Sequence, residues 1–144
     1  MALRLSDGLR TAMIATDDFK SLFEGGYLDI YSGAQPTIAN AAETGTKLVS
    51  IYGTAGTGGL SFGTAGTGTL PISSVAWAGT IGVSGVAGWF RLYDANKTTG
   101  TNGTARRMDG NCGLSGADLV LSHTNLVAAT TLTIKTFSLT QPAE

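Results

Sequence analysis

The stretch that decides the fold covers residues 48–90 and reads LVSIYGTAGTGGLSFGTAGTGTLPISSVAWAGTIGVSGVAGWF. Between Lys47 and Arg91 it contains no Asp, Glu, Lys, Arg or His. Gly, Thr and Ser interrupt its apolar residues every few positions, so it falls far short of the roughly 20 apolar residues that a membrane-spanning helix needs. Short apolar segments between Gly and Thr favour strands and turns. Because soluble monomers usually carry charge on their surfaces, we expect a β-rich protein whose neutral faces press against neighbouring subunits.

An alternation of period two indicates strands on both sides of this stretch and inside it. Residues 27–31 and 47–52 are predicted strands, and residues 89–93 carry large side chains on both faces, which predicts a central strand. Within residues 74–84 one predicted strand face carries Val75, Trp77, Gly79, Ile81 and Val83. The segments 52–60 and 62–70 are near copies of each other, each an aromatic residue, a Gly/Thr turn and a leucine. This duplication favours consecutive hairpins or a loop that orders against a neighbour.

The C-terminal part adds weaker strands. Residues 104–108 are predicted to form an edge strand, where Arg106 and Arg107 would hinder unwanted pairing. Residues 118–121 form another predicted strand. Residues 131–139 alternate cleanly until Ile134, after which Phe137 takes the opposite parity, so we expect a bulge or a change of sheet there.

The first 25 residues are predicted to be helical. Leu5, Leu9 and Met13 recur at the spacing of one helix face. Ser6 is a candidate N-cap, although Gly8 weakens this prediction. A second helix is expected to start at Thr16, and Gly25-Gly26 is a strong stop signal. Phe19, Leu22 and Phe23 would share one face of that second helix.

Together these patterns predict a mainly β, single-domain β-sandwich, jelly-roll-like, of roughly eight strands with a short N-terminal helical segment. We expect a helical arm over residues 1–25 and a β-sandwich domain over residues 26–144. Sandwich, jelly roll and barrel give the same local signals, so strand order stays open.

Composition narrows the functional classes. The net charge is −1 and the basic residues are scattered, so nothing indicates nucleic-acid binding. Cys112 is the single cysteine, which excludes an intrachain disulfide and a cysteine-based zinc site. The chain opens without a signal-peptide pattern, and we expect synthesis in a reducing cytoplasm.

The candidates for chemistry all have simpler explanations. The sequence contains no G-x-S-x-G nucleophile elbow that could pair with His123, and Cys112 lies in a turn-like segment. A hydrolase that uses these two residues is therefore disfavoured. The Gly/Thr repeats lack the lysine of a phosphate loop. Asp94-x-Asn96 and Asp109-x-Asn111 are read as Asx turns, and Asp17-Asp18 as helix-start residues. We therefore predict a protein that is not an enzyme, with no catalytic residue, cofactor or metal.

Four large aromatic residues admit two interpretations. Trp77, Trp89, Phe90 and Tyr93 could form a platform for carbohydrate, or they could fill the core. Their alternation within apolar strands favours the core.

Several motifs resemble a known group of proteins. They are Leu5-Ser-x-Gly-Leu9, Phe19-Lys-x-Leu22, Leu28-Asp-Ile-Tyr31, Ser32-Gly-Ala-Gln-Pro36, Ala42-Glu-Thr-Gly-Thr46, Leu48-Val-x-Ile51 and Gly85-x-Ala-Gly-Trp-Phe-Arg-Leu-Tyr-Asp94. In these motifs the chain resembles small virion structural proteins of tailed bacteriophages. The resemblance spans most of residues 1–94 and is weaker beyond. It implies a small β domain present in many copies on the particle, of the capsid cement or decoration type, with a neck or tail protein as the alternative.

The resemblance and the uncharged stretch lead to the same expectation, a virion protein made in the host bacterial cytoplasm. We expect the major capsid protein or other virion proteins as partners, a homo-oligomer (a trimer by analogy), and no nucleic-acid or membrane partner. A carbohydrate-binding or adhesion module is the rival from another class. The residues predicted to contact other subunits are Leu5, Leu9, Met13, Phe19, Phe23, Tyr52, Leu60, Phe62 and Leu70.

Overall fold

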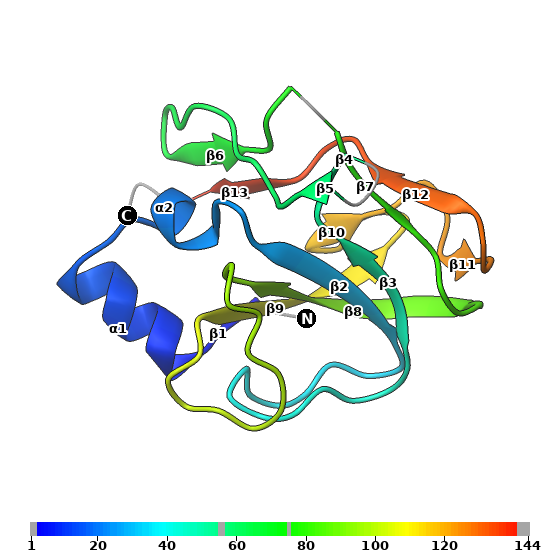
Figure 1. Ribbon diagram of the computed structural model, residues 1–144, viewed down its shortest axis with the longest axis horizontal. Helices are drawn as coiled ribbons and strands as arrows, with labels where there is room; N and C mark the ends of the chain where they lie inside the picture. Colours follow the sequence, from blue (N-terminus) through cyan, green and yellow to red (C-terminus); the bar gives the residue numbers. More distant parts are fainter. Residues whose placement is uncertain (1–2, 55–56, 75, 141–144) are drawn as a thin grey trace.

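The computed structural model describes residues 3–54, 57–74 and 76–140 (Figure 1). It has two short helices, α1 (Asp7–Ala15) and α2 (Phe19–Phe23). The strands are β1 (Arg4–Leu5), β2 (Tyr27–Ser32), β3 (Lys47–Ile51), β4 (Gly53–Thr54), β5 (Thr57–Gly58), β6 (Thr69–Pro71), β7 (Trp77–Thr80), β8 (Gly85–Tyr93), β9 (Arg107–Gly113), β10 (Leu119–Val120), β11 (Asn125–Leu126), β12 (Thr131–Ile134) and β13 (Ser138–Thr140). The chain is therefore mainly β, as predicted.

One large sheet organises the molecule. Its strand order is β1-β9-β8-β2-β3, and these neighbours are all antiparallel. Short strands extend two of them, since β11 pairs with β8 and β10 runs parallel to β9. The strand β8 lies at the centre, which confirms the prediction for residues 89–93, and β2 and β3 confirm the strands predicted at 27–31 and 47–52.

The two faces of this sheet differ in chemistry because side chains alternate along each strand. One face is apolar and fully buried, and it carries Leu28, Ile30, Phe90, Leu92 and Met108. The opposite face carries a row of charged side chains across three adjacent strands, in which Asp29 lies beside Arg91 and Arg91 lies beside Asp109.

Two-stranded ladders cover the apolar face. β7 pairs with β12, β6 with β13, and β4 with β5. In Figure 1 the first two lie above the main sheet, while the segments 33–46 and 94–106 lie below it. The change of sheet expected near Phe137 is confirmed, because β12 and β13, on either side of it, belong to different ladders. The structure thus has one large antiparallel sheet with small sheets packed beside it.

The largest apolar side chains of the uncharged stretch lie inside the chain's own core, whereas its residues 64–68 and 82–84 are exposed. For these buried side chains, the expected cover by neighbouring subunits is not needed. Leu48, Ile51, Leu60, Trp77 and Phe90 are all almost completely buried within this single chain. The same side chains belong to one continuous apolar cluster. Burial within the fold therefore explains the lack of charge at these side chains, but not at the exposed residues 64–68 and 82–84.

Two strand predictions need correction. The residues predicted as an edge strand at 104–108 lead into β9, an interior strand between β1 and β8, and Arg107 is fully buried in it. The strand predicted over 74–84 shortens to β7; Val83 lies beyond its end and is exposed, whereas Val75 lies outside the described residues.

The first helix begins after the predicted cap, but Leu5, which was expected to share its apolar face with Leu9 and Met13, lies before it in strand β1. Ser6 caps α1, and its Oγ accepts a hydrogen bond from the Leu9 amide at 3.2 Å. The second helix starts later than predicted, because Asp18 rather than Thr16 is its N-cap. Gly25 has a φ of 77°, the left-handed conformation expected at this stop. Among the described residues, no helix is long and apolar enough to cross a membrane.

The predicted N-terminal arm shares the core of the large sheet. Its strand β1 pairs with β9, and the side chains of Leu9 and Phe23 are fully buried in the common cluster. The arm therefore packs onto its own domain in this structure.

Candidate interaction groove

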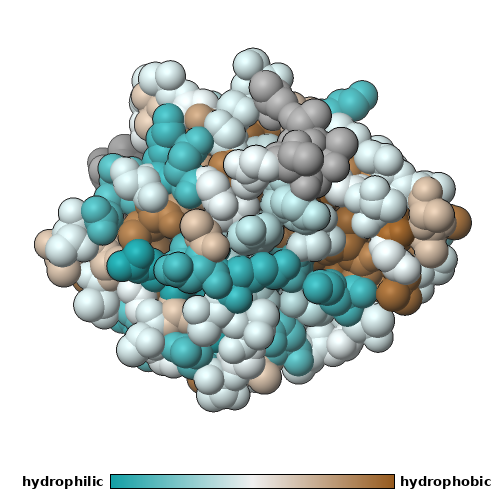
Figure 2. Space-filling view, in the orientation of Figure 1, coloured by the Kyte–Doolittle hydropathy of each residue, from teal (hydrophilic) through white to brown (hydrophobic). Residues whose placement is uncertain are grey.

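An apolar groove with a volume of about 790 Å³ opens where β1 and the two helices meet the β6–β13 ladder. We call it the edge groove. Its apolar lining includes Leu5, Met13, Phe19, Leu70, Met108 and Leu139. On the face shown in Figure 2, apolar residues reach the surface beside α2, with hydrophilic residues around them. An opening of this size falls within the range of clefts that bind ligands or peptide side chains.

The groove lies between β1, the edge strand of the main sheet, and the separate β6–β13 ladder. Leu5 on β1 lies beside Met108 on β9, and both contribute to the groove. On the other side, Leu139 and Leu70 are register partners in the β6–β13 ladder. Met108 is buried, while Leu5 keeps 39% of its surface exposed, so the groove passes from the core to solvent across β1.

One mouth of the groove is acidic. Asp17 and Asp18 line it at the junction of the helices, together with Lys20. Asp18 accepts hydrogen bonds from the amide and the hydroxyl of Ser21, both at 2.9 Å. These bonds hold the pKa of the Asp18 carboxyl below its usual value, so it is ionised at neutral pH. The Lys20 Nζ donates to the Gly63 carbonyl at 3.1 Å. Two carboxylates and one ammonium group leave this mouth with a net negative charge.

The nine predicted contact residues divide between the groove and the core. Four of them line the groove, namely Leu5, Met13, Phe19 and Leu70. Four others are buried in the chain's own core, namely Leu9, Phe23, Leu60 and Phe62. The ninth, Tyr52, is half-buried and packs against Tyr27, with ring centroids 5.3 Å apart. The buried four offer no surface to a partner in this fold.

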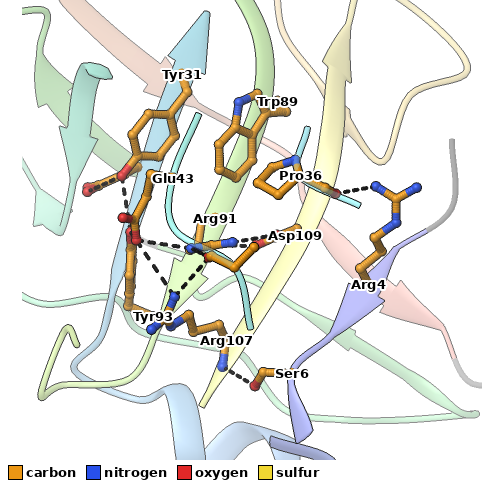
Figure 3. Close-up of polar contacts among 12 residues, drawn as sticks. Arg4, Ser6, Tyr31, Pro36, Glu43, Trp89, Arg91, Tyr93, Arg107 and Asp109 are labelled. Atoms are coloured by element: carbon orange, nitrogen blue, oxygen red, sulfur yellow. Dashed lines mark hydrogen bonds and ion pairs between the residues drawn. The ribbon is translucent and has the colours of Figure 1, made fainter. Parts of the chain in front are cut away.

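A buried ion pair on the opposite face of the sheet was not predicted (Figure 3). Arg91 and Asp109 are both fully buried. The Arg91 Nε donates to Oδ1 of Asp109 at 2.6 Å, and Nη2 donates to Oδ2 at 2.8 Å. This two-pronged geometry is the strong form of a charge-assisted hydrogen bond. Although burial alone would lower it, the pKa of Arg91 is raised by Asp109.

The ion pair holds a long loop against the sheet. We call this loop, residues 33–46, the strap. Arg91 Nη1 donates to the Ala41 carbonyl at 2.9 Å and to the Glu43 carboxylate at 3.0 Å. Glu43 also accepts from the Tyr93 hydroxyl at 2.8 Å and the Gly100 amide at 3.0 Å. Burial raises the pKa of Glu43, but hydrogen bonds from its own backbone amide, the Gly100 amide and the Tyr93 hydroxyl, together with the charge of Arg91, hold the pKa below the ordinary value.

The strap also fixes the position of β1, and therefore the open side of the groove. Arg4 on β1 donates from Nη1 to the carbonyl of Pro36 (Figure 3). The Asn40 amide donates to the Asp7 carboxylate at 2.7 Å and accepts from the Asp7 backbone amide at 3.0 Å. The polar face of the sheet thus positions, through the strap, the strand that borders the edge groove.

Of the residues considered for chemistry, Asp17 and Asp18 line this groove, whereas His123, Cys112, Asp94 and Asp109 do not. His123 is exposed, and its Nδ1 lies 3.0 Å from the hydroxyl of the adjacent Ser122. Burial raises the pKa of the Cys112 thiol to about 12, which keeps it protonated. Asp94 forms the predicted Asx turn with the Asn96 amide, but Asp109 does not, because it is the buried partner of Arg91. Within residues 3–54, 57–74 and 76–140, no cluster of three or more His, Cys, Asp or Glu could hold a metal ion.

The large aromatic residues belong to the core, as predicted. Trp77, Trp89, Phe90 and Tyr93 expose at most 1% of their surfaces. Tyr31 stacks on Trp89 with ring centroids 4.6 Å apart, and Phe62 packs edge-on against Trp77. Neither tryptophan presents a ring face to a sugar in this structure.

No protein-family model matches the sequence, and neither the curated proteins nor the solved structures yielded a match.

Proposed function

We propose that this chain is a non-enzymatic structural protein of a tailed-phage virion, a cement or decoration protein that binds the capsid shell through the edge groove. The observation that carries the proposal is the apolar groove itself, which leaves Leu5 and neighbouring apolar side chains accessible at the edge of an otherwise filled core. Removing such surface from water contributes about 25 cal/mol per Å², reduced by the cost of association. A protein that works by contact needs such a surface and no reaction centre.

The resemblance to small virion proteins supports the proposal, because two of its motifs contribute residues to this groove, Leu5 from one and Phe19 and Lys20 from another. Leu5-Ser-x-Gly-Leu9 forms β1, the cap of α1 and its first turn. Gly85 to Asp94 covers the central strand β8, and Ala42 to Thr46 supplies the end of the strap. The resemblance thus concerns the scaffold and the element that positions the groove edge.

The finer architecture belongs to the proposal as well. We propose that the main sheet and the ladders facing it form a jelly-roll-like sandwich whose second sheet is divided into pairs. A trimer, expected by analogy, is part of the same proposal.

The experiment locates the chain on the particle. Virions purified from the phage that encodes this chain are labelled with an antibody against the purified protein and imaged by electron microscopy. Label over the whole shell supports the cement proposal, and label at one vertex indicates the neck or tail instead. Absence of the chain from washed, intact particles, checked by mass spectrometry, would refute the virion proposal. Particles from a phage deleted for this chain serve as the control for antibody specificity.

A further inference from the structure

The edge groove has a second property that its apolar lining does not explain, an unpaired sheet edge. β1 is the outermost strand of the main sheet, and in the described part of the chain no strand lies on its outer side. The β6–β13 ladder across the groove is a separate two-stranded sheet. Exposed strand edges present unpaired amide and carbonyl groups, to which an extended peptide can add as a further strand.

We infer that the edge groove binds an extended segment of another polypeptide, which adds as a strand beside β1. In an extended segment every second side chain points to the same face. The face directed into the groove would meet Leu5, Met108 and Leu139, so it must be apolar. The backbone of the added strand would supply hydrogen bonds, and these apolar side chains would supply the buried area.

The charge of the groove determines one further feature of the segment. The mouth beside Asp17 and Asp18 is negative, and the ammonium group of Lys20 is already directed to the Gly63 carbonyl. A Lys or Arg at that end of the segment would complement the two carboxylates, whereas an Asp or Glu would be repelled. The occupant is therefore a strand with alternating apolar residues and a basic residue near one end. A helix would leave the edge of β1 unpaired, and a fatty acid would bring its carboxylate to an acidic mouth.

The inference does not depend on where the protein works, so it can be tested apart from the virion proposal. A random library of peptides about twelve residues long, enough for a strand with flanking residues, is displayed on yeast and selected against the purified full-length chain. Selected peptides are then synthesised, and their affinities are measured for three forms of the protein: wild type, Leu5→Asp and the control Val86→Asp.

The two substitutions are matched because both replace an exposed apolar residue, Leu5 at 39% and Val86 at 57% exposure, and only Leu5 lines the groove. Far-ultraviolet circular dichroism and melting curves verify that both variants fold. We expect selected peptides to lose affinity about tenfold or more with Leu5→Asp, because a charge then replaces an apolar contact. We expect little change with Val86→Asp. A family of peptides with equal affinity for all three forms would overturn the inference.

Two further measurements distinguish an added strand from other ways of filling the groove. In a selected peptide, either the odd-numbered or the even-numbered backbone amides can be N-methylated. Only one of these two sets should abolish binding, because only the amides that face β1 donate hydrogen bonds to it. Asp17→Asn with Asp18→Ser removes both charges and keeps a capping residue. It should weaken binding of peptides with a basic end about two- to fivefold per charge and flatten the salt dependence. Peptides insensitive to N-methylation, or selected peptides without a basic end, contradict the inference.

A second copy of this chain is the competing occupant. Sedimentation velocity of the wild type and Leu5→Asp over a range of concentrations separates the two cases. If the wild type self-associates, Leu5→Asp abolishes this association and the selected peptides compete with it, then the occupant of the groove is a second copy of the chain and not a peptide segment of another protein.

Discussion

Replacement of Arg91 by methionine should be one of the most costly single changes in this protein. Arg91 is fully buried and makes four hydrogen bonds, two of them to the Asp109 carboxylate and one each to Glu43 and the Ala41 carbonyl. Methionine has a similar shape but no donor, so it leaves the charge of Asp109 buried without its partner. Breaking a buried pair in this way costs about 3–5 kcal/mol. Because a domain is stable by only about 5–15 kcal/mol, this loss consumes much of the total.

A double variant shows how much of the lost unfolding free energy comes from leaving the Asp109 charge buried without a partner. Arg91→Met with Asp109→Leu removes both charges, while Glu43 keeps its bonds from Tyr93 and Gly100. Because the Asp109 carboxylate is then no longer buried without Arg91, we expect it to be at least about 2 kcal/mol more stable than Arg91→Met alone.

Urea unfolding at neutral pH, followed by tryptophan fluorescence, measures these differences in the free energy of unfolding. Arg10→Met is the matched control, because Arg10 forms an exposed pair with Asp7 and its loss should have no measurable effect. If Arg91→Met lowers the free energy of unfolding by less than about 1 kcal/mol, the reasoning is refuted, because the ion pair would then be exposed to water or not formed.

Three further outcomes follow from the same contacts. The pKa of Glu43 lies below its ordinary value of 4.5, so the stability that its carboxylate contributes is complete above that pH and is lost as the pH falls further. Urea unfolding at several pH values should therefore show a smaller loss of stability at acid pH for Glu43→Gln than for the wild type. An identical loss in both proteins would contradict this. Gly8→Ala should destabilise the fold by about 1–3 kcal/mol in the same assay, because the new Cβ would lie 2.1 Å from the Thr104 carbonyl oxygen, whereas helix propensity alone predicts a gain. The Cys112 thiol, whose pKa burial raises to about 12, should react with iodoacetamide at pH 8 far more slowly in the native protein than in urea, and equal rates would show that it is not buried.

The main strands could be predicted from the sequence because their periodicity is local. Residues 27–31 alternate, residues 89–93 carry large side chains on both faces, and the parity change at Phe137 indicates a bulge or a change of sheet, of which the structure shows the change of ladder. The capping role of Ser6 was also a local signal. Such features depend on neighbours in the chain and therefore need no knowledge of the tertiary fold.

The polar face of the sheet was missed although it leaves a trace in the sequence. Along residues 89–93 the side chains alternate, with Trp89, Arg91 and Tyr93 on one side and Phe90 and Leu92 on the other. This alternation indicates one strand face with polar groups and one apolar face. The rule that charged residues lie outside placed Arg107 at an exposed edge. Its actual burial depends on β1, a strand of only two residues whose pairing with β9 no local pattern shows.

The sequence patterns indicate only part of the groove lining. The amphipathic pattern of residues 5–23 points to Leu5, Met13 and Phe19, and these residues line the groove. The uncharged stretch points equally to Leu60 and Phe62, but both of these residues lie in the core. A lack of charge identifies residues that avoid water, but it does not show whether the chain itself or a partner covers them.

The central claim is that this chain buries the large apolar side chains of its uncharged stretch within its own fold. Hydrogen–deuterium exchange of the purified protein over a hundredfold dilution tests this claim most directly. We predict that amides of β3, β7 and β8 stay protected to the same degree at every concentration, because their cover comes from the same molecule. Protection of these strands that disappears on dilution would contradict the account, since the cover would then come from neighbouring subunits.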